Sequence, residues 1–192
     1  MHNDSLFRAV FGRLENLRGW LRDLLRDQPI AAQIDWDSLV PLQQITANEH
    51  LRQKLRDLAF VANQVGTSNL VLVIIEMVTG NRRWAGRRTV TYSIDSMYEW
   101  NASHPAGPHM TALPIVLHLG AQRLTHNLWL DAPKTPFRLG RDNAGISVGI
   151  ALDELAAQSE VDIRARQLPP AVTLALLFAQ FVNRKKPDEV EA

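Results

Sequence analysis

The stretch LVLVIIEMV at positions 70–78 is the sequence feature that most constrains the fold of this chain. Six consecutive apolar residues, 70–75, lead into a single carboxylate, Glu76, and Met77 and Val78 come after it. A short apolar run of this kind, bounded by turn residues, is typical of a strand inside a hydrophobic core. An ionised glutamate at the end of a buried strand is costly unless a nearby group compensates its charge. The position of Glu76 therefore indicates a specific role for its carboxylate.

The preceding segment, KLRDLAFVANQV at 54–65, is expected to form a hairpin with this strand through the turn residues GTSN at 66–69. Side chains alternate between the two faces of a strand, so the register decides which residues meet. A two-residue turn places Asp57 directly opposite Glu76, whereas a four-residue loop places Asp57 opposite Val78. Either register brings the two carboxylates close together on one face.

Two like charges side by side in a half-buried sheet repel each other. A divalent cation between Asp57 and Glu76 is the simplest remedy, and magnesium prefers carboxylate and water ligands. The alternative is a pair of solvated or ion-paired carboxylates without a metal. Cations near them in the sequence are Arg52, Lys54 and Arg56 for Asp57, and Arg82 and Arg83 for Glu76.

The rest of the chain predicts further elements around this hairpin. Apolar spacing predicts helices over 5–26, 83–102, 150–159 and 169–183, a buried strand over 113–119, a short strand around Leu39–Val40, and edge strands within 121–147. The order of helix, hairpin, helix and strand predicts a mixed α/β arrangement of layers around one sheet.

Composition limits the classes of protein to consider. The 192 residues are 46% hydrophobic, which suits one domain with a real core, or one domain with an appendage. A net charge of +1 requires any nucleic-acid site to be a local patch, and the absence of cysteine excludes thiolate metal sites. Every apolar stretch falls short of the roughly 20 residues of a membrane span. With no signal peptide visible, we expect a soluble, cytoplasmic protein without a membrane partner.

A local basic patch, NRRWAGRR at 81–88, follows the apolar strand. Its residues Arg82, Arg83, Arg87 and Arg88 are candidates for contacts with nucleic-acid phosphates, which give affinity without reading sequence. The alternative is an ordinary solvated helix face. The histidines have no spacing typical of a zinc site, so we assign them structural or surface roles.

Five blocks of the sequence resemble a known protein family in their order and spacing. They are DSLFRAVFG at 4–12, IDWDSLVPL at 34–42, LRQKLRDLAF at 51–60, LVLVIIEMV at 70–78 and LPIVLHLG at 113–120. The family is that of the recombination-promoting nucleases, also called putative transposase, YhgA-like, within the PD-(D/E)xK nuclease superfamily. The resemblance implies a restriction-endonuclease-like mixed sheet flanked by helices. It implies a nuclease-like core over 1–120 and a divergent part over 121–192, which we expect to pack on the core with two helices.

The resemblance also implies roles for individual residues. Asp57 and Glu76 match the family's metal-binding carboxylates, for Mg²⁺ or Mn²⁺, and Asp4 matches an acidic residue of the N-terminal helix. The family has Gln or Lys where this chain has Val78. Since valine can neither position nor polarise a water molecule, a polar group from elsewhere must replace it, or cleavage is weakened or lost.

Three hypotheses about function follow. The first is a metal-dependent DNA endonuclease with catalytic Asp57, Glu76 and Asp4. The second is a nuclease fold without the chemistry, which binds nucleic acid or a protein. The third is an interaction protein that forms a homo-oligomer or binds a partner through 121–192, because the helix AVTLALLFAQFV is so apolar.

Overall fold

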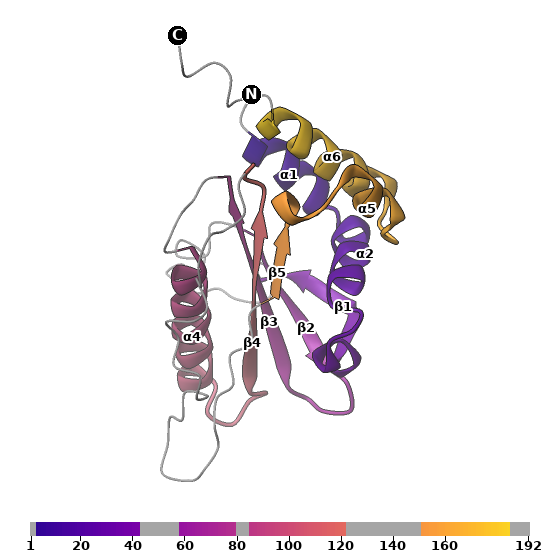
Figure 1. Ribbon diagram of the computed structural model, residues 1–192. Helices are drawn as coiled ribbons and strands as arrows, with labels where there is room; N and C mark the ends of the chain where they lie inside the picture. Colours follow the sequence, from indigo (N-terminus) through magenta and orange to yellow (C-terminus); the bar gives the residue numbers. More distant parts are fainter. Residues whose placement is uncertain (1–2, 43–57, 80–84, 122–150, 185–192) are drawn as a thin grey trace.

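The computed structural model describes residues 3–42, 58–79, 85–121 and 151–184 (Figure 1). In chain order the elements are the helices α1 (Asn3–Phe11) and α2 (Leu14–Leu24), the 3₁₀ helix η1 (Pro29–Gln33), the strands β1 (Ile34–Pro41), β2 (Leu58–Gln64) and β3 (Leu70–Val78), helix α4 (Ala85–Ser103), the strands β4 (Met110–His118) and β5 (Ala151–Glu154), the 3₁₀ helix η3 (Leu155–Ala157), and the helices α5 (Glu160–Ala165) and α6 (Pro170–Arg184). None of the described helices combines the length and the apolar character needed to cross a membrane.

The described strands form one mixed sheet in the order β1-β2-β3-β4-β5. The first three strands are antiparallel neighbours, whereas β4 runs parallel to β3, and β5 runs parallel to β4 at the edge. Helix α4 makes the crossover between β3 and β4, as a parallel pair requires. The predicted fold class is thereby confirmed, since a mixed sheet flanked by helices is consistent with a restriction-endonuclease-like fold.

The predicted hairpin of β2 and β3 is confirmed, and β3 has the predicted bounds. Leu58 pairs with Ile75 and Asn63 pairs with Leu70, which is the first of the two registers considered for this hairpin. Gly66 in the turn adopts a φ of 76°, a left-handed conformation that glycine accepts without a steric penalty. The other register is therefore excluded for the described part of the hairpin.

The two faces of the sheet bury two different clusters of side chains. On one face, Val71, Val73 and Ile75 of β3 belong to a large core that is closed by α1, α2 and α6. On the other face, Leu72 and Ile74 pack with Trp100 of α4. Figure 1 shows α4 alone on one side of the sheet and the remaining helices on the other. The alternation of side chains along β3 thus assigns each residue to one helix layer.

The single helix predicted over 5–26 is wrong, because the chain forms two helices that part at Gly12 and Arg13. The Gly12 N–H still donates to the Arg8 oxygen at 2.8 Å, and a Cβ at position 12 would come within 2.6 Å of that oxygen. After the break the rings of Phe11 and Trp20 pack with centroids 4.9 Å apart. The change of direction lets both helices bury their apolar faces in the same core.

The helix predicted over 150–159 is also wrong. Residues 151–154 form β5, which pairs with the end of β4 from Ile115 to His118, and η3 follows it. Pairing with an available sheet edge overrides the helical propensity of this segment. The short strand expected around Leu39–Val40 is a full strand, β1, and the strand over 113–119 starts earlier, at Met110. The edge strands predicted within 121–147 fall on residues 122–150, outside the described part.

Candidate active site at the ends of three strands

Glu76 lies in the last third of β3 and is only 4% exposed. It follows Leu72 and Ile74 on the same face of the strand, and these two residues pack against the α4 side. The carboxylate of Glu76 is therefore inside the molecule, between the sheet and the layer of α4. The predicted burial of this acidic residue is correct.

Val78, at the end of β3, has an apolar environment. It is 2% exposed and packs with Val116 of β4, and the partly buried Leu152 of β5 lies against the same pair. These three residues form a small apolar cluster beside Glu76. The position where the resemblance implies a polar Gln or Lys is thus filled by hydrocarbon in this chain.

His118 ends β4 directly beside Val78 in the parallel ladder, and Glu154 of β5 is its partner on the other side. His118 is 1% exposed, and its Nδ1 lies 3.7 Å from Oε1 of Glu154. Since Val116 and Leu152 share the face of Val78, the residues two positions on, His118 and Glu154, share it too. The ends of three neighbouring strands thus place Glu76, His118 and Glu154 on one face.

Gly120 fixes the space that the His118 ring occupies. A Cβ at position 120 would lie 2.6 Å from Nε2 of His118 and 3.2 Å from the main-chain oxygen of Thr79. Only a residue without a side chain therefore lets the imidazole pack against the chain at this point. The His118 ring lies between Gly120 on one side and the carboxylate of Glu154 on the other.

Helix α4 brings its first turns to the same end of the sheet. Because β3 and β4 are parallel, the helix that connects them runs back along the sheet, and its Trp100 packs near the starts of these strands. Its earlier residues Thr89 and Ser93 are fully buried, and the Ser93 hydroxyl donates to the Thr89 oxygen at 2.8 Å. Hydroxyl side chains on α4 therefore face the sheet on the Glu76 side.

The structure describes only part of the predicted site. Asp57 lies outside the described residues, although the observed register, continued by one pair, is the register that places position 57 opposite position 76. Asp4 belongs to α1, and Arg87 and Arg88 belong to the first turn of α4, but their side chains are not among those described. Arg82 and Arg83 also lie outside the described residues. Glu76 is the one predicted site residue whose side chain is placed.

A metal ion would need more ligands than the described residues bring together. Among the described side chains, no group of three His, Asp or Glu residues lies close enough to hold a metal. The buried carboxylate of Glu76 has the chemistry of one hard oxygen ligand for Mg²⁺ or Mn²⁺. The remaining ligands of the predicted site would have to include Asp57.

Sequence reasoning gave no site role to His118 or Glu154. His118 is the polar residue at the end of the apolar run LPIVLH in the predicted strand. A polar side chain in such a buried position was the feature of the sequence that could have indicated a site residue. Glu154 gave no signal, because its segment was interpreted as a helix and not as the strand next to β4. Long-range strand order, which no local pattern reveals, places these two residues on the same sheet face as Glu76.

A second buried polar cluster lies on the opposite face of the sheet and is structural. Arg166 donates to both carboxylate oxygens of Asp153 at 2.9 Å and to Asp23 at 2.7 Å, and Trp20 also donates to Asp153. Burial alone would lower the pKa of Arg166, but the hydrogen bonds and charges of Asp153 and Asp23 outweigh it and raise that pKa. These bonds tie α2, β5 and the chain after α5 together.

The sequence matches one protein-family model. A model of the family described as "Putative transposase, YhgA-like" matches residues 1–137, which include Glu76 and His118. Searches of curated proteins and of solved structures gave no match. The match spans more than half of the chain and covers the hairpin, α4 and β4. The chain therefore belongs to the putative transposase, YhgA-like, family, as its five sequence blocks predicted.

Proposed function

We propose that this protein is a metal-dependent DNA endonuclease that hydrolyses phosphodiester bonds. The observation that carries the proposal is the burial of Glu76 on one sheet face, at the strand ends where His118 and Glu154 also lie. A buried carboxylate in an apolar strand is retained at a cost in stability, and such groups concentrate at functional sites. Membership of a transposase family supports DNA as the substrate.

In this proposal Glu76 and Asp57 hold Mg²⁺ or Mn²⁺, and Asp4 assists through a bound water. A bound Mg²⁺ or Mn²⁺ supplies a water of lowered pKa and offsets the negative charge that develops on the phosphate. Glu76 needs no large movement to act as a metal ligand, because β3 is hydrogen-bonded to β2 on one side and to β4 on the other. The arginines Arg82, Arg83, Arg87 and Arg88 bind the phosphate backbone, and this binding does not depend on DNA sequence.

A second candidate function is a nuclease fold that binds nucleic acid or a protein and does not cleave DNA. The apolar packing of Val78 with Val116 and Leu152 favours it. No polar atom in this cluster can orient an attacking water beside Glu76. If the second function is correct, the metal site and the basic patch serve only to bind nucleic acid or a protein, and the protein does not cleave DNA.

The nicking of supercoiled plasmid separates these two functions. The parent protein, with millimolar Mg²⁺ or Mn²⁺, is compared with Glu76→Gln, which keeps the size of the side chain and removes its charge. Nicking by the parent that Glu76→Gln abolishes supports the endonuclease. Equal nicking by both proteins indicates a contaminant and contradicts the proposal.

DNA binding is measured separately, so that a loss of cleavage is not mistaken for a loss of the site. Replacing Arg83 and Arg87 by alanine should weaken binding at low salt and make its dependence on salt shallower, since fewer counterions are released. A parent that binds DNA but does not cut it, in either metal, favours the second function. Unchanged binding by the double variant would show that these arginines form an ordinary solvated surface.

A further inference from the structure

Helix α6 is apolar on its outer side as well as on its inner side. From Pro170 to Asn183 its sequence contains no charged residue. Val172, Leu176 and Ala179 face the core and are fully buried. Leu174, Phe178 and Phe181 are 67%, 45% and 58% exposed, and we call these three residues the α6 stripe. A helix that is apolar all round is ordinarily covered on all sides, so the stripe indicates a contact surface.

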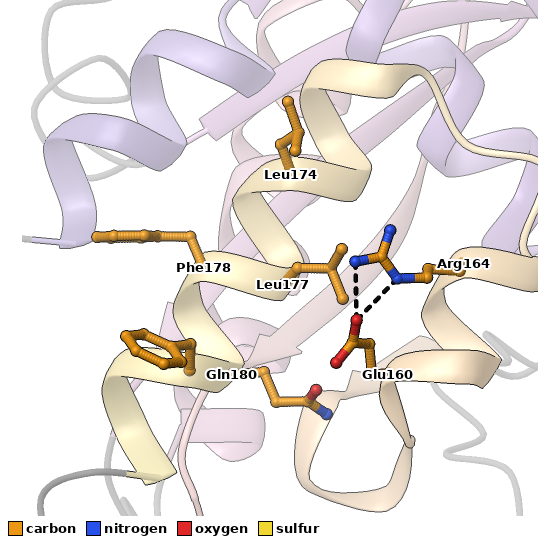
Figure 2. A pocket seen from close by; sticks show the side chains of 7 residues that line it. Glu160, Arg164, Leu174, Leu177, Phe178 and Gln180 are labelled. Atoms are coloured by element: carbon orange, nitrogen blue, oxygen red, sulfur yellow. Dashed lines mark hydrogen bonds and ion pairs between the residues drawn. The ribbon is translucent and has the colours of Figure 1, made fainter.

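The stripe borders a groove between α6 and the short helix α5 (Figure 2). In Figure 2 Leu177 and Gln180 line the groove from α6, and Glu160 and Arg164 line it from α5. Glu160 and Arg164 pair with each other at 2.7 Å, and both side chains are about 60% exposed. The rim of the groove therefore carries one charge of each sign, and its centre carries none.

The charges on this surface select the kind of occupant. DNA or an anionic membrane would require an excess of basic side chains at the contact, and the described rim has no excess. A charged helix would have to desolvate its charges against the uncharged stripe without a partner for them. An apolar helix beside one positive and one negative side chain needs no excess of basic residues and has no unpaired charge to desolvate. A second copy of this chain has such a surface.

We propose that α6 packs against α6 of a second copy of this chain across a two-fold axis near Phe178. In such a contact the same surface serves both subunits, so it must complement itself. The three members of the stripe recur at intervals of four and three residues, which places them in one line along α6 for helix-to-helix packing. Near the two-fold axis, Phe178 of one subunit contacts Phe178 of the other.

The helix is held firmly enough to present this surface. On its inner side Gln180 donates to the Gln158 oxygen at 2.7 Å, and Asn183 donates to the Leu119 oxygen. A stable interface buries roughly 800 Å² per partner, which is more than three side chains supply. The stripe is then the central contact of a small interface, and the dimer dissociates on dilution.

Sedimentation equilibrium over a wide range of protein concentrations, without DNA or metal, tests the proposal independently of cleavage. The parent should shift from monomer to dimer as its concentration rises. Phe178→Asp should weaken the dimer at least about tenfold, because two carboxylates meet near the axis. The matched control is Tyr98→Asp, since Tyr98 on α4 is an aromatic residue that is 76% exposed on the other side of the sheet. It should dimerise as the parent does.

A mixture of Phe178→Asp and Phe178→Lys gives the decisive result. Each variant alone places like charges together, whereas the mixed pair places opposite charges together, so the mixture should form a dimer that neither variant forms alone. A parent that stays monomeric at every concentration overturns the proposal. So does a Phe178→Asp variant that dimerises as the parent does, or a mixture that stays monomeric. Circular dichroism establishes that each variant is folded before its dimerisation is measured.

Discussion

Val78 of β3 and His118 of β4 are paired in the parallel ladder, with their side chains on the same face of the sheet. An apolar residue and a buried imidazole are thus direct neighbours at the strand ends, two pairs beyond Glu76 and Val116. This arrangement leaves two explanations for the absence of a polar side chain at position 78. Either the polar group beside Glu76 is missing, or a neighbouring strand provides it.

Val78→Gln is expected to increase Mg²⁺-dependent nicking of plasmid DNA if the missing polar group limits the reaction. The glutamine would replace hydrocarbon with an amide that can hold a water beside Glu76. Val78→Leu, which stays apolar, is the matched control and should leave the rate unchanged or lower it. Both variants should lose about 1–3 kcal/mol of stability through overpacking, because Val78 is only 2% exposed. Equal rates for Gln and Leu would contradict this explanation.

Millimolar Mn²⁺ is expected to raise the melting temperature of the parent, because a ligand that binds only the folded state stabilises it. At a hundredfold excess over Kd the gain is about 2.7 kcal/mol, and each kcal/mol is worth about 2–4 °C for a domain of this size. Glu76→Gln should lose this shift. Glu160→Gln should keep it, since Glu160 is exposed on α5. A metal-induced shift that survives Glu76→Gln would place the ion elsewhere.

Gly120→Ala is expected to destabilise the protein by about 1–3 kcal/mol, because its Cβ would lie 2.6 Å from Nε2 of His118. The buried ring has little room to move away. Urea denaturation of a double-mutant cycle with His118→Ala measures the coupling between the two positions. The cost of Gly120→Ala should fall when the ring is absent. The same cost in both backgrounds would show that the clash is with the main chain at Thr79.

Arg166→Met is expected to cost about 3–5 kcal/mol, because it leaves the buried carboxylate of Asp153 without a cation and leaves Asp23 with Arg26 alone. Arg164→Met removes an exposed ion pair and should cost well under 1 kcal/mol. Because the pKa of Arg166 is raised above that of an ordinary arginine, its stabilising effect is complete below the ordinary value and is lost only as the pH rises through the folded one. Chemical denaturation at pH 8 and pH 10 should therefore give the same difference between parent and variant.

Local sequence patterns predicted the centre of this fold well. The apolar run of β3, the turn after β2 and the amphipathic helix α4 are each specified by neighbouring residues, and the structure has all three. The break at Gly12 was missed because both helices follow one apolar pattern, and their packing on the core decides the angle between them. β5 was missed because the segment 151–154 resembles a helix until the edge of β4 is available to it.

The same distinction explains what could be predicted of the site. Glu76 stands out within its own strand, so its burial was predictable from nine residues of sequence. His118 and Glu154 become relevant only because β4 and β5 are the next two strands of the sheet. The sequence contains no short-range signal for that order. The pairing of Asp57 with Glu76 stays a prediction.

Helix α1 lies beside α6 in the structure, so the first and last described helices close the same core together (Figure 1). Phe7 and Phe11 of α1 share this core with Val172 and Leu176 of α6. During synthesis the N-terminal helices leave the ribosome long before α6 does, and their apolar faces stay uncovered until it emerges. Completion of the core is thus a late event in translation, and until then the nascent chain exposes apolar surface of the kind that promotes aggregation.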